Sequence, residues 1–273
     1  MGKAALRVLA ASLCTLPFAA PLLLMVGASL RDPQSPLPGG FAPLPSAPSL
    51  AAFTAAFEAV PLANALWQST WIAAVAVPPS LLTASWAGLG VALAKGRWRN
   101  LLLGVTLLLL VVPATATWLT RFALFKSLGW VGTPLPVLAP ALMGGAPLLV
   151  LLYADAFRRI PSELLDSARV EGASLLRVWW SIALPQVRPT SAAVGLLAFA
   201  ASWTGFLDPL LYLHREEQLT APLMLQHLEL LGSTQWSVLM AGAVVVTLPA
   251  VVAFAFAGRG LFEERRGTGW LQG

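Results

Sequence analysis

Charged residues are scarce in this sequence: Asp, Glu, Lys and Arg account for 11% of its 273 residues. A soluble globular domain carries roughly a quarter charged residues, because its surface must face water. Hydrophobic residues instead make up 58% of the chain, and the mean hydropathy is +0.76. This composition excludes an ordinary soluble domain, and it excludes disorder, which requires low hydrophobicity. It is typical of a membrane protein.

Cysteine and the common nucleotide-binding and hydrolase motifs are missing or nearly so. Cys14 is the single cysteine, so neither an intrachain disulfide nor a two-cysteine metal site can form. Neither G-x-x-x-x-G-K-S/T nor G-x-S-x-G occurs, so the chain cannot cradle a nucleotide phosphate or present a serine on a nucleophile elbow. We therefore expect a chain that is not an enzyme and that holds no cofactor of its own.

The basic surplus, 17 Lys and Arg against 12 Asp and Glu, raises the question of nucleic acid. A nucleic-acid binder gathers its charge on one soluble face. Here the charges fall in short islands between apolar windows, so no nucleic-acid partner is expected.

One segment combines two histidines with acidic residues: His214 and His227 occur with Glu216, Glu217 and Glu229. Their spacing matches no compact set of metal ligands. We interpret the segment as a solvated outer loop and expect no metal.

Long windows without charge dominate the chain. They are residues 8–30, 59–94, 100–120, 127–154, 189–207 and 230–258. A spanning helix needs about 20 mostly apolar residues, so each window has room for one span. The predicted fold is all-α, a single transmembrane domain over residues 1–273. Its six spans are placed at 8–30, 62–90, 100–120, 134–157, 189–211 and 237–258.

Residues 31–60 are predicted to be an external loop. Six prolines fall between Pro33 and Pro48, and proline removes a backbone donor that a spanning segment needs. Lys3 and Arg7 before the first apolar run resemble a signal peptide. That run is too long and lacks a small-residue cleavage site before Arg31, so an uncleaved anchor is the favoured interpretation.

The basic residues predict the orientation, because Lys and Arg are retained on the cytoplasmic side. With both termini cytoplasmic, 13 of the 17 basic residues lie inside and 4 outside. The inside residues are Lys3, Arg7, Lys95, Arg97, Arg99, Arg158, Arg159, Arg169, Arg177, Arg188, Arg259, Arg265 and Arg266. The outside residues are Arg31, Arg121, Lys126 and Arg215. Most tryptophans, Trp179 and Trp180 among them, fall near span ends and are interpreted as interfacial anchors.

The cytoplasmic loop 158–188 is the only one long enough to hold structure. Pro161 and Ser162 predict a helix start, and Gly172 predicts its end. Ser174 can cap a second helix that ends before Pro185. The pattern therefore predicts a helical hairpin, which either rests on the membrane or docks a soluble partner.

The same loop carries a family signature. Asp166, Ser167 and Ala168 are followed after three residues by Gly172, and after nine more by the sequence Ile-Ala-Leu-Pro that ends at Pro185. This resembles the motif E-A-A-x3-G-x9-I-x-L-P of the inner-membrane permease subunits of bacterial ATP-binding-cassette (ABC) importers. Further likenesses to the maltose-type carbohydrate branch are Phe157 to Pro161, Asn64, Pro113, Trp203, Phe206, Pro209, Leu210 and the tail 267–273.

The resemblance implies a function and a set of partners. The chain would be half of the translocation pathway of an ATP-driven importer for a di- or oligosaccharide, or for a related solute such as glycerol phosphate. It implies a second, distinct permease subunit, two copies of a Walker-type ATPase that bind ATP and Mg²⁺, and an extracytoplasmic solute-binding protein. It also implies multi-pass insertion in the bacterial inner membrane.

The resemblance makes the hairpin the element that couples the chain to the ATPase. The residues assigned to coupling are Glu163, Leu164, Leu165, Asp166, Ser167, Ala168, Val170, Gly172, Ile182, Leu184 and Pro185. We expect Leu164, Leu165, Ala168 and Val170 to be buried in a groove of the ATPase. Asp166 would face a basic residue there and orient the helix.

Candidate solute contacts come from three aromatic residues. Trp203 and Phe206, three apart, would share one helical face, and Tyr212 follows them. They could line the solute pathway, or they could pack against the partner permease. The sequence favours neither interpretation.

A second class of protein fits the composition: an ion-coupled carrier that works without an ATPase. Such a carrier should show paired charges inside its spans. Asp155 and Asp208 lie at predicted span ends, so interfacial positions are favoured over a proton relay.

Overall fold

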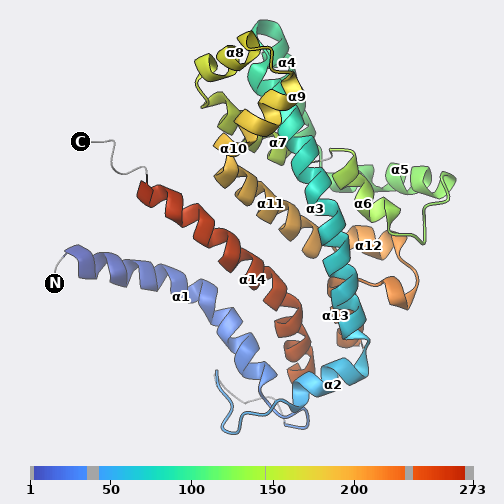
Figure 1. Ribbon diagram of the computed structural model, residues 1–273. Helices are drawn as coiled ribbons and strands as arrows, with labels where there is room; N and C mark the ends of the chain where they lie inside the picture. Colours follow the sequence, from blue (N-terminus) through green and yellow to red (C-terminus); the bar gives the residue numbers. More distant parts are fainter. Residues whose placement is uncertain (1–2, 36–42, 145, 231–235, 268–273) are drawn as a thin grey trace. The chain divides into compact units, whose positions relative to one another are not determined.

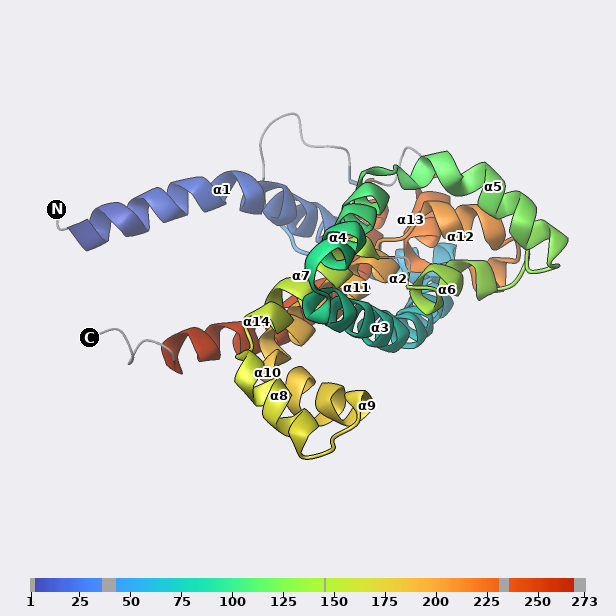
Figure 2. The same cartoon turned by 90° about the horizontal axis from the view of Figure 1, so that it is seen from above.

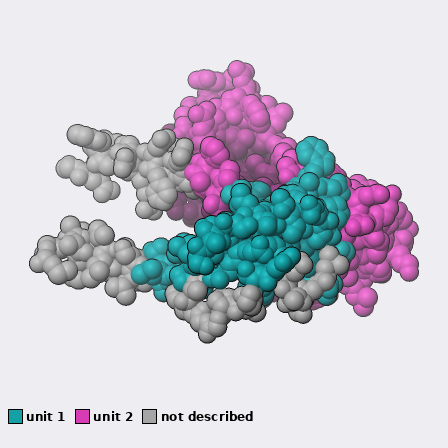
Figure 3. Space-filling view, turned by 90° about the horizontal axis from the view of Figure 1, so that it is seen from below, with its two compact units in different colours: residues 1–67, 220–249 teal, residues 68–219, 250–273 magenta. Residues whose placement is uncertain are grey.

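The computed structural model describes residues 3–35, 43–144, 146–230 and 236–267, and every regular element within these ranges is a helix (Figure 1). The all-α prediction is confirmed for this part of the chain. The chain divides into two compact units (Figure 3). Unit 1 comprises residues 1–67 and 220–249, and unit 2 comprises residues 68–219 and 250–273.

Unit 1 combines the N-terminal segment with residues 220–249. Its elements are α1 (Lys3–Ser29), α2 (Ala51–Ala59), the start of α3 (Leu62–Leu93), α13 (Ala221–Leu230) and the first part of α14 (Trp236–Gly267). α2 falls inside the segment predicted to be a loop. Five of its nine residues are alanine, which favours a helix, and Ala52 and Ala56 are completely buried. His227, placed by sequence in an outer loop, lies in α13 and is exposed.

Unit 2 contains the remaining elements. They are the rest of α3, α4 (Gly96–Val111), α5 (Ala114–Ser127), α6 (Leu135–Leu142), α7 (Pro147–Arg158), α8 (Ser162–Val170), α9 (Leu175–Val178), the π-helical turn η1 (Trp179–Ala183), α10 (Leu184–Gln186), α11 (Arg188–Trp203), α12 (Leu207–Tyr212), the 3₁₀ turn η2 (Glu216–Gln218) and the end of α14.

The core of unit 2 lies where α3, α7 and α11 meet. Leu89, Tyr153 and Val194, one from each helix, are almost completely buried there. α3 and α7 approach closely at Gly88, where a Cβ atom would lie 2.5 Å from Cβ of Tyr153. Small residues allow such close helix contacts inside a membrane, so Gly88 fixes how these two helices pack.

The segment predicted as the third span is broken. α4 ends at Val111 and α5 begins at Ala114, and the two helices meet at 88°. Proline disfavours helical geometry in the residue before it, and Val112 is accordingly extended before Pro113. The segment 100–120 thus contains two helices that meet at a bend, and its assignment as one span stays a prediction.

The described residues hold three helices long and apolar enough to cross a membrane, or four if the bent pair counts as one. The three are Leu62–Leu93, Leu135–Arg158 and Trp236–Ala257. Thr15–Ser29 is a shorter apolar helix, and α11 has 16 residues. The count of six spans thus stays a prediction.

Candidate functional site

The loop 158–188 folds as a helix, a glycine turn and a second helix. α8 and α9 lie side by side at one end of unit 2 (Figure 1, Figure 2). Gly172 between them has a φ of 80°, a left-handed conformation that residues with a Cβ rarely adopt. The backbone N–H of Arg177 donates to Oγ of Ser174 at 3.3 Å, which caps the second helix as its sequence predicts.

The inner face of this hairpin has its own apolar core. Leu165 and Ala168 of α8 pack with Val178 of α9, and all three are less than a tenth exposed. Ile182 and Leu93 pack against the same cluster. The expectation that Leu165 and Ala168 insert into an ATPase groove was therefore wrong, because they already hold the two arms of the hairpin together.

The outer face of the hairpin carries apolar side chains that are exposed in this chain. Val170 is 88% exposed, Leu176 57% and Leu164 39%. Glu163 and Ser167 are exposed beside them. Five predicted coupling residues of α8 are thus exposed: Glu163, Leu164, Asp166, Ser167 and Val170. Leu176 of α9 was not among the predicted coupling residues.

Asp166 lies on the same helix and pairs loosely within the chain. Its Oδ1 is 3.9 Å from Nη1 of Arg169, and its side chain is 69% exposed. An exposed pair of this kind contributes only about 0.2–1 kcal/mol, so the carboxylate can exchange Arg169 for a basic group of another protein.

The second arm runs further than predicted, through Pro185 to Gln186. The turn Trp179–Ala183 is π-helical, and the N–H of Leu184 bonds to the carbonyl of Trp179, five residues back. This widened turn ends two residues before Pro185, which has no N–H to contribute and would strain an ordinary helix at that point. The expected helix end before Pro185 was wrong.

A buried tryptophan ties the hairpin to the long helix α3. Nε1–H of Trp179 donates to Oγ of Ser85 at 3.3 Å, and both residues are at most 3% exposed. The Trp179 ring also lies 5.1 Å from the Trp86 ring. Interpreting Trp179 as an interfacial anchor missed this contact, whereas Trp180 beside it is 63% exposed.

The three aromatic candidates for solute contact do not form one surface. α11 ends at Trp203, so Phe206 lies beyond the helix and the expected shared face was wrong. Trp203 is 3% exposed and stacks on Phe199 with ring centroids 5.5 Å apart. Whether the three residues serve a solute pathway stays a prediction.

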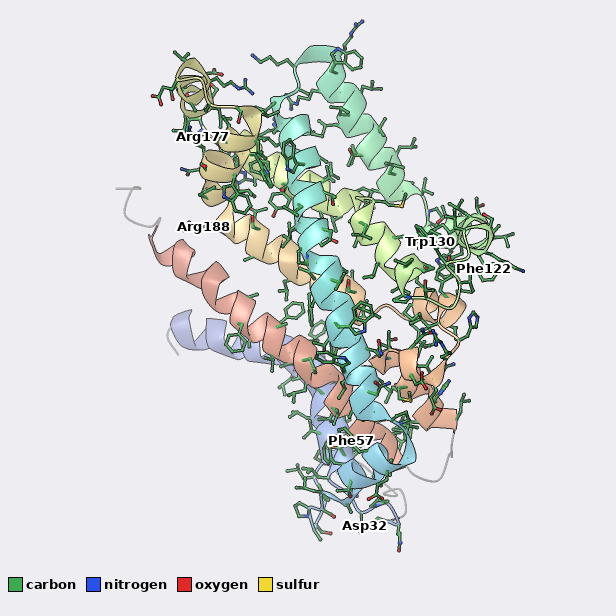
Figure 4. All side chains as sticks on the ribbon, turned by 45° about the vertical axis from the view of Figure 1, so that its right-hand side comes forward. Asp32, Phe57, Phe122, Trp130, Arg177 and Arg188 are labelled. Atoms are coloured by element: carbon green, nitrogen blue, oxygen red, sulfur yellow. The ribbon has the colours of Figure 1, made fainter. Side chains whose placement is uncertain are left out.

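Tyr212 is enclosed by other rings. It is completely buried, stacks on Phe122 at 6.1 Å and meets Phe125 edge-on at 5.5 Å. Phe122 and Trp130 border this cluster (Figure 4). The cluster joins α5 to α12.

An ion pair joins the same two helices. Nη2 of Arg121 lies 3.0 Å from Oδ2 of Asp208. Asp155, the other candidate for an intramembrane charge, is 63% exposed and pairs with Arg159 one turn on. Asp208 also borders a cavity of about 540 Å³ between α3, α6, α7, α11 and α12. Asp208 was expected to be an interfacial charge, and neither its ion pair nor the cavity was predicted from the sequence.

Known proteins resemble this chain over most of its length. The family model of the binding-protein-dependent transport system inner membrane component matches residues 80–259. The arabinooligosaccharides transport system permease protein AraQ of Halalkalibacterium halodurans is 32% identical over 189 residues, which cover 69% of this chain and 67% of that protein. The lactose transport system permease protein LacG of Rhizobium radiobacter is 29% identical over 198 residues, 72% of each chain.

The fold has a counterpart among solved structures. A bacterial ABC transporter involved in the import of the acidic polysaccharide alginate aligns with a TM-score of 0.76 at 17% identity, over 94% of this chain and 95% of that one. The family match covers the hairpin, the core of unit 2 and all of the cavity lining except Ile72 and Ala76. The chain belongs to the family of binding-protein-dependent transport system inner membrane components.

Proposed function

We propose that this chain is a permease subunit of an ATP-driven ABC importer for a carbohydrate, and that it forms half of the translocation pathway. The observation that carries the proposal is the family match over residues 80–259, which includes the glycine turn and the hairpin. Relatives named for arabinooligosaccharides and for lactose support a di- or oligosaccharide as the solute. An ion-coupled carrier is not favoured by these relatives.

The hairpin α8–α9 is the docking element for the ATPase. Its outer face offers the exposed apolar groups of Leu164, Val170 and Leu176, whose burial against a partner would supply the binding free energy. Exposed Asp166 would orient the contact. The inner face stays packed, so the hairpin would dock as a preformed body and lose little conformational freedom on binding.

Movement of the docked hairpin reaches the membrane helices through Trp179. Its hydrogen bond to Ser85 and its ring contact with Trp86 connect the second arm to α3. Closure of the ATPase dimer on ATP would thus turn α3 together with the hairpin, as alternating access by rigid-body motion requires.

The remaining parts of the importer come from other chains. ATP and Mg²⁺ are held by two copies of a Walker-type ATPase, and a second, distinct permease completes the pathway. An extracytoplasmic binding protein delivers the solute. A solved alginate ABC transporter was captured in complex with an alginate pentasaccharide-bound periplasmic protein, which supports that part of the proposal. The chain itself crosses the bacterial inner membrane six times with both termini cytoplasmic.

Purification of the chain from its native membrane through an affinity tag tests the proposal. A Walker-type ATPase should be retained by the tagged wild-type chain. A variant with Leu164→Asp and Leu176→Asp should insert in the membrane and lose the ATPase, because the charges would be buried in the contact. Leu44→Asp, at a 70% exposed position of the predicted external loop, serves as the control and should retain the ATPase. Purification of the wild-type chain without any ATPase would contradict the proposal.

A further inference from the structure

The cavity beside α11 and α12 is apolar over most of its wall and polar at one end. Small and aliphatic side chains such as Ala76, Ala141 and Leu197 line it, and Thr204, Gly205 and Asp208 close the polar end. Its volume of about 540 Å³ falls in the range of small-molecule sites, roughly 300–1,000 Å³.

The polar end offers acceptors. The hydroxyl of Thr204 donates its proton to the carbonyl of Ala200 at 2.8 Å, so its oxygen is left to accept. Gly205 follows the end of α11, and a Cβ there would lie within 3.4 Å of the carbonyl oxygens of Ala201 and Ser202. The carboxyl end of a helix carries partial negative charge.

Asp208 adds a carboxylate that is held in place and has acceptor capacity to spare. Its Oδ2 accepts from Arg121, while its Oδ1 has no hydrogen-bond partner among the described residues. An ionised carboxylate can accept about four hydrogen bonds, so one bond from Arg121 leaves most of that capacity free. Oδ1 is buried, so a ligand hydroxyl would reach it after a small rotation of the side chain, and that contact would relieve the cost of an acceptor without a donor.

The residues that line the cavity include neither Lys, Arg nor His in the described part of the chain. The guanidinium of Arg121, which contacts the lining residue Asp208, is already bound to it. An anionic ligand would therefore meet a carboxylate and a helix carboxyl end without a free cation, whereas a neutral polyol can donate its hydroxyls to all of these acceptors.

We propose that this cavity is a solute subsite for a neutral carbohydrate, and that it discriminates against phosphorylated or carboxylated solutes. The proposal rests on the proposed function and narrows its solute class, because it removes glycerol phosphate and acidic sugars. It also moves the expected contacts from Trp203 and Tyr212, which are buried in other packing, to Thr204, Gly205 and Asp208.

The single native cysteine gives a direct test. Cys14→Ser yields a chain without cysteine, into which Ala201→Cys places a thiol at the cavity wall. Ala192→Cys is the matched control, because nine residues at about 100° each place it on the opposite face of α11. The purified complex is treated with N-ethylmaleimide in the presence of arabinotriose, lactose or maltotriose, and separately with digalacturonate or glycerol phosphate.

We expect at least one of the neutral sugars to slow alkylation of the Ala201→Cys thiol, about tenfold at ten times its dissociation constant. The anionic solutes should have no effect, and the Ala192→Cys thiol should react at one rate throughout. Protection by an anionic solute, or by none of the three neutral sugars, would overturn the proposal.

A filling substitution provides the second measurement. Ala201→Leu should reduce ATP-driven uptake of the protecting sugar at least tenfold while the complex still assembles, and Ala192→Leu should leave uptake unchanged. Loss of assembly in Ala201→Leu would make the cavity a subunit interface and would overturn the subsite. The ATPase that copurifies with the wild-type chain reports on the proposed function separately, so failure of the subsite and failure of the importer are distinguishable.

Discussion

Nη2 of Arg121 lies 3.0 Å from Oδ2 of Asp208, a residue 87 positions further along the chain. The two side chains are 24% and 26% exposed. Arg121 belongs to α5, the helix that turns away from α4 at Pro113, and Asp208 belongs to α12, which follows the break after α11. The pair therefore joins the two segments that follow helix breaks, α5 after α4 and α12 after α11.

Breaking this pair should destabilise the chain. Replacing Arg121 by Ala leaves a partly buried carboxylate unpaired, which we expect to cost about 1–3 kcal/mol, between the values for exposed and buried pairs. A double-mutant cycle with Asp208→Ala, followed by thermal unfolding in detergent, measures the coupling. Additive effects of the two substitutions would mean that the pair contributes nothing.

Substitutions at Leu164 and Leu165 allow the effect on ATPase binding to be measured apart from the effect on stability. Leu165→Ala opens a cavity in the hairpin core and should cost about 2–5 kcal/mol of stability. Leu164→Ala makes the same truncation at a 39% exposed position, so stability should change by no more than about 0.5 kcal/mol. Leu164→Ala should instead weaken binding of the ATPase, as measured by titration of the purified subunits. Equal loss of stability in both variants would contradict the assignment of the two faces.

Gly172 is required for its backbone conformation and not for space. A Cβ at this position meets no atom within 4 Å, yet φ is 80°. Gly172→Val should therefore cost about 1–2 kcal/mol and disturb the turn, whereas Gly172→Asn, which tolerates this conformation, should cost less. Solute-stimulated ATPase activity in proteoliposomes should fall more in the valine variant than in the asparagine variant. Normal stimulation there would show that the turn is not needed for coupling.

The bond from Trp179 to Ser85 should matter for stability and for transmission. Ser85→Ala leaves a buried indole N–H without its partner, at a cost of about 1–3 kcal/mol. Adding Trp179→Phe removes that donor, so the second substitution should cost less in the Ser85→Ala background than in the wild type. Unfolding of the four proteins in detergent provides the comparison, and equal costs in both backgrounds would rule out the bond.

Local patterns were enough to predict the hairpin. Its start at Ser162, its turn at Gly172 and its cap at Ser174 are set by residues within a few positions of each other. The inward direction of Leu165 and Ala168 could not be predicted, because it depends on Val178 and Leu93 elsewhere in the chain. A stripe of apolar residues predicts that a face is buried, but not which surface covers it.

Breaks of helices inside apolar windows were not predicted from the sequence. Pro113 is the kind of residue that ends a helix, yet it lies in a long run without charge, and window length alone suggested one span. α11 ends at Trp203, and no proline directly follows that would predict this end from the sequence. The pair Arg121–Asp208 and the cavity follow from these breaks, so neither could be inferred before the fold was known.

ATP-driven uptake in proteoliposomes tests the central claim most directly. The complex that copurifies with this chain is reconstituted with its binding protein, and entry of a labelled neutral oligosaccharide is measured with and without ATP at the ATPase side. We predict uptake that requires ATP, persists when ionophores collapse all ion gradients and disappears in the Leu164→Asp, Leu176→Asp variant. Uptake that proceeds without ATP and follows an imposed ion gradient would contradict it.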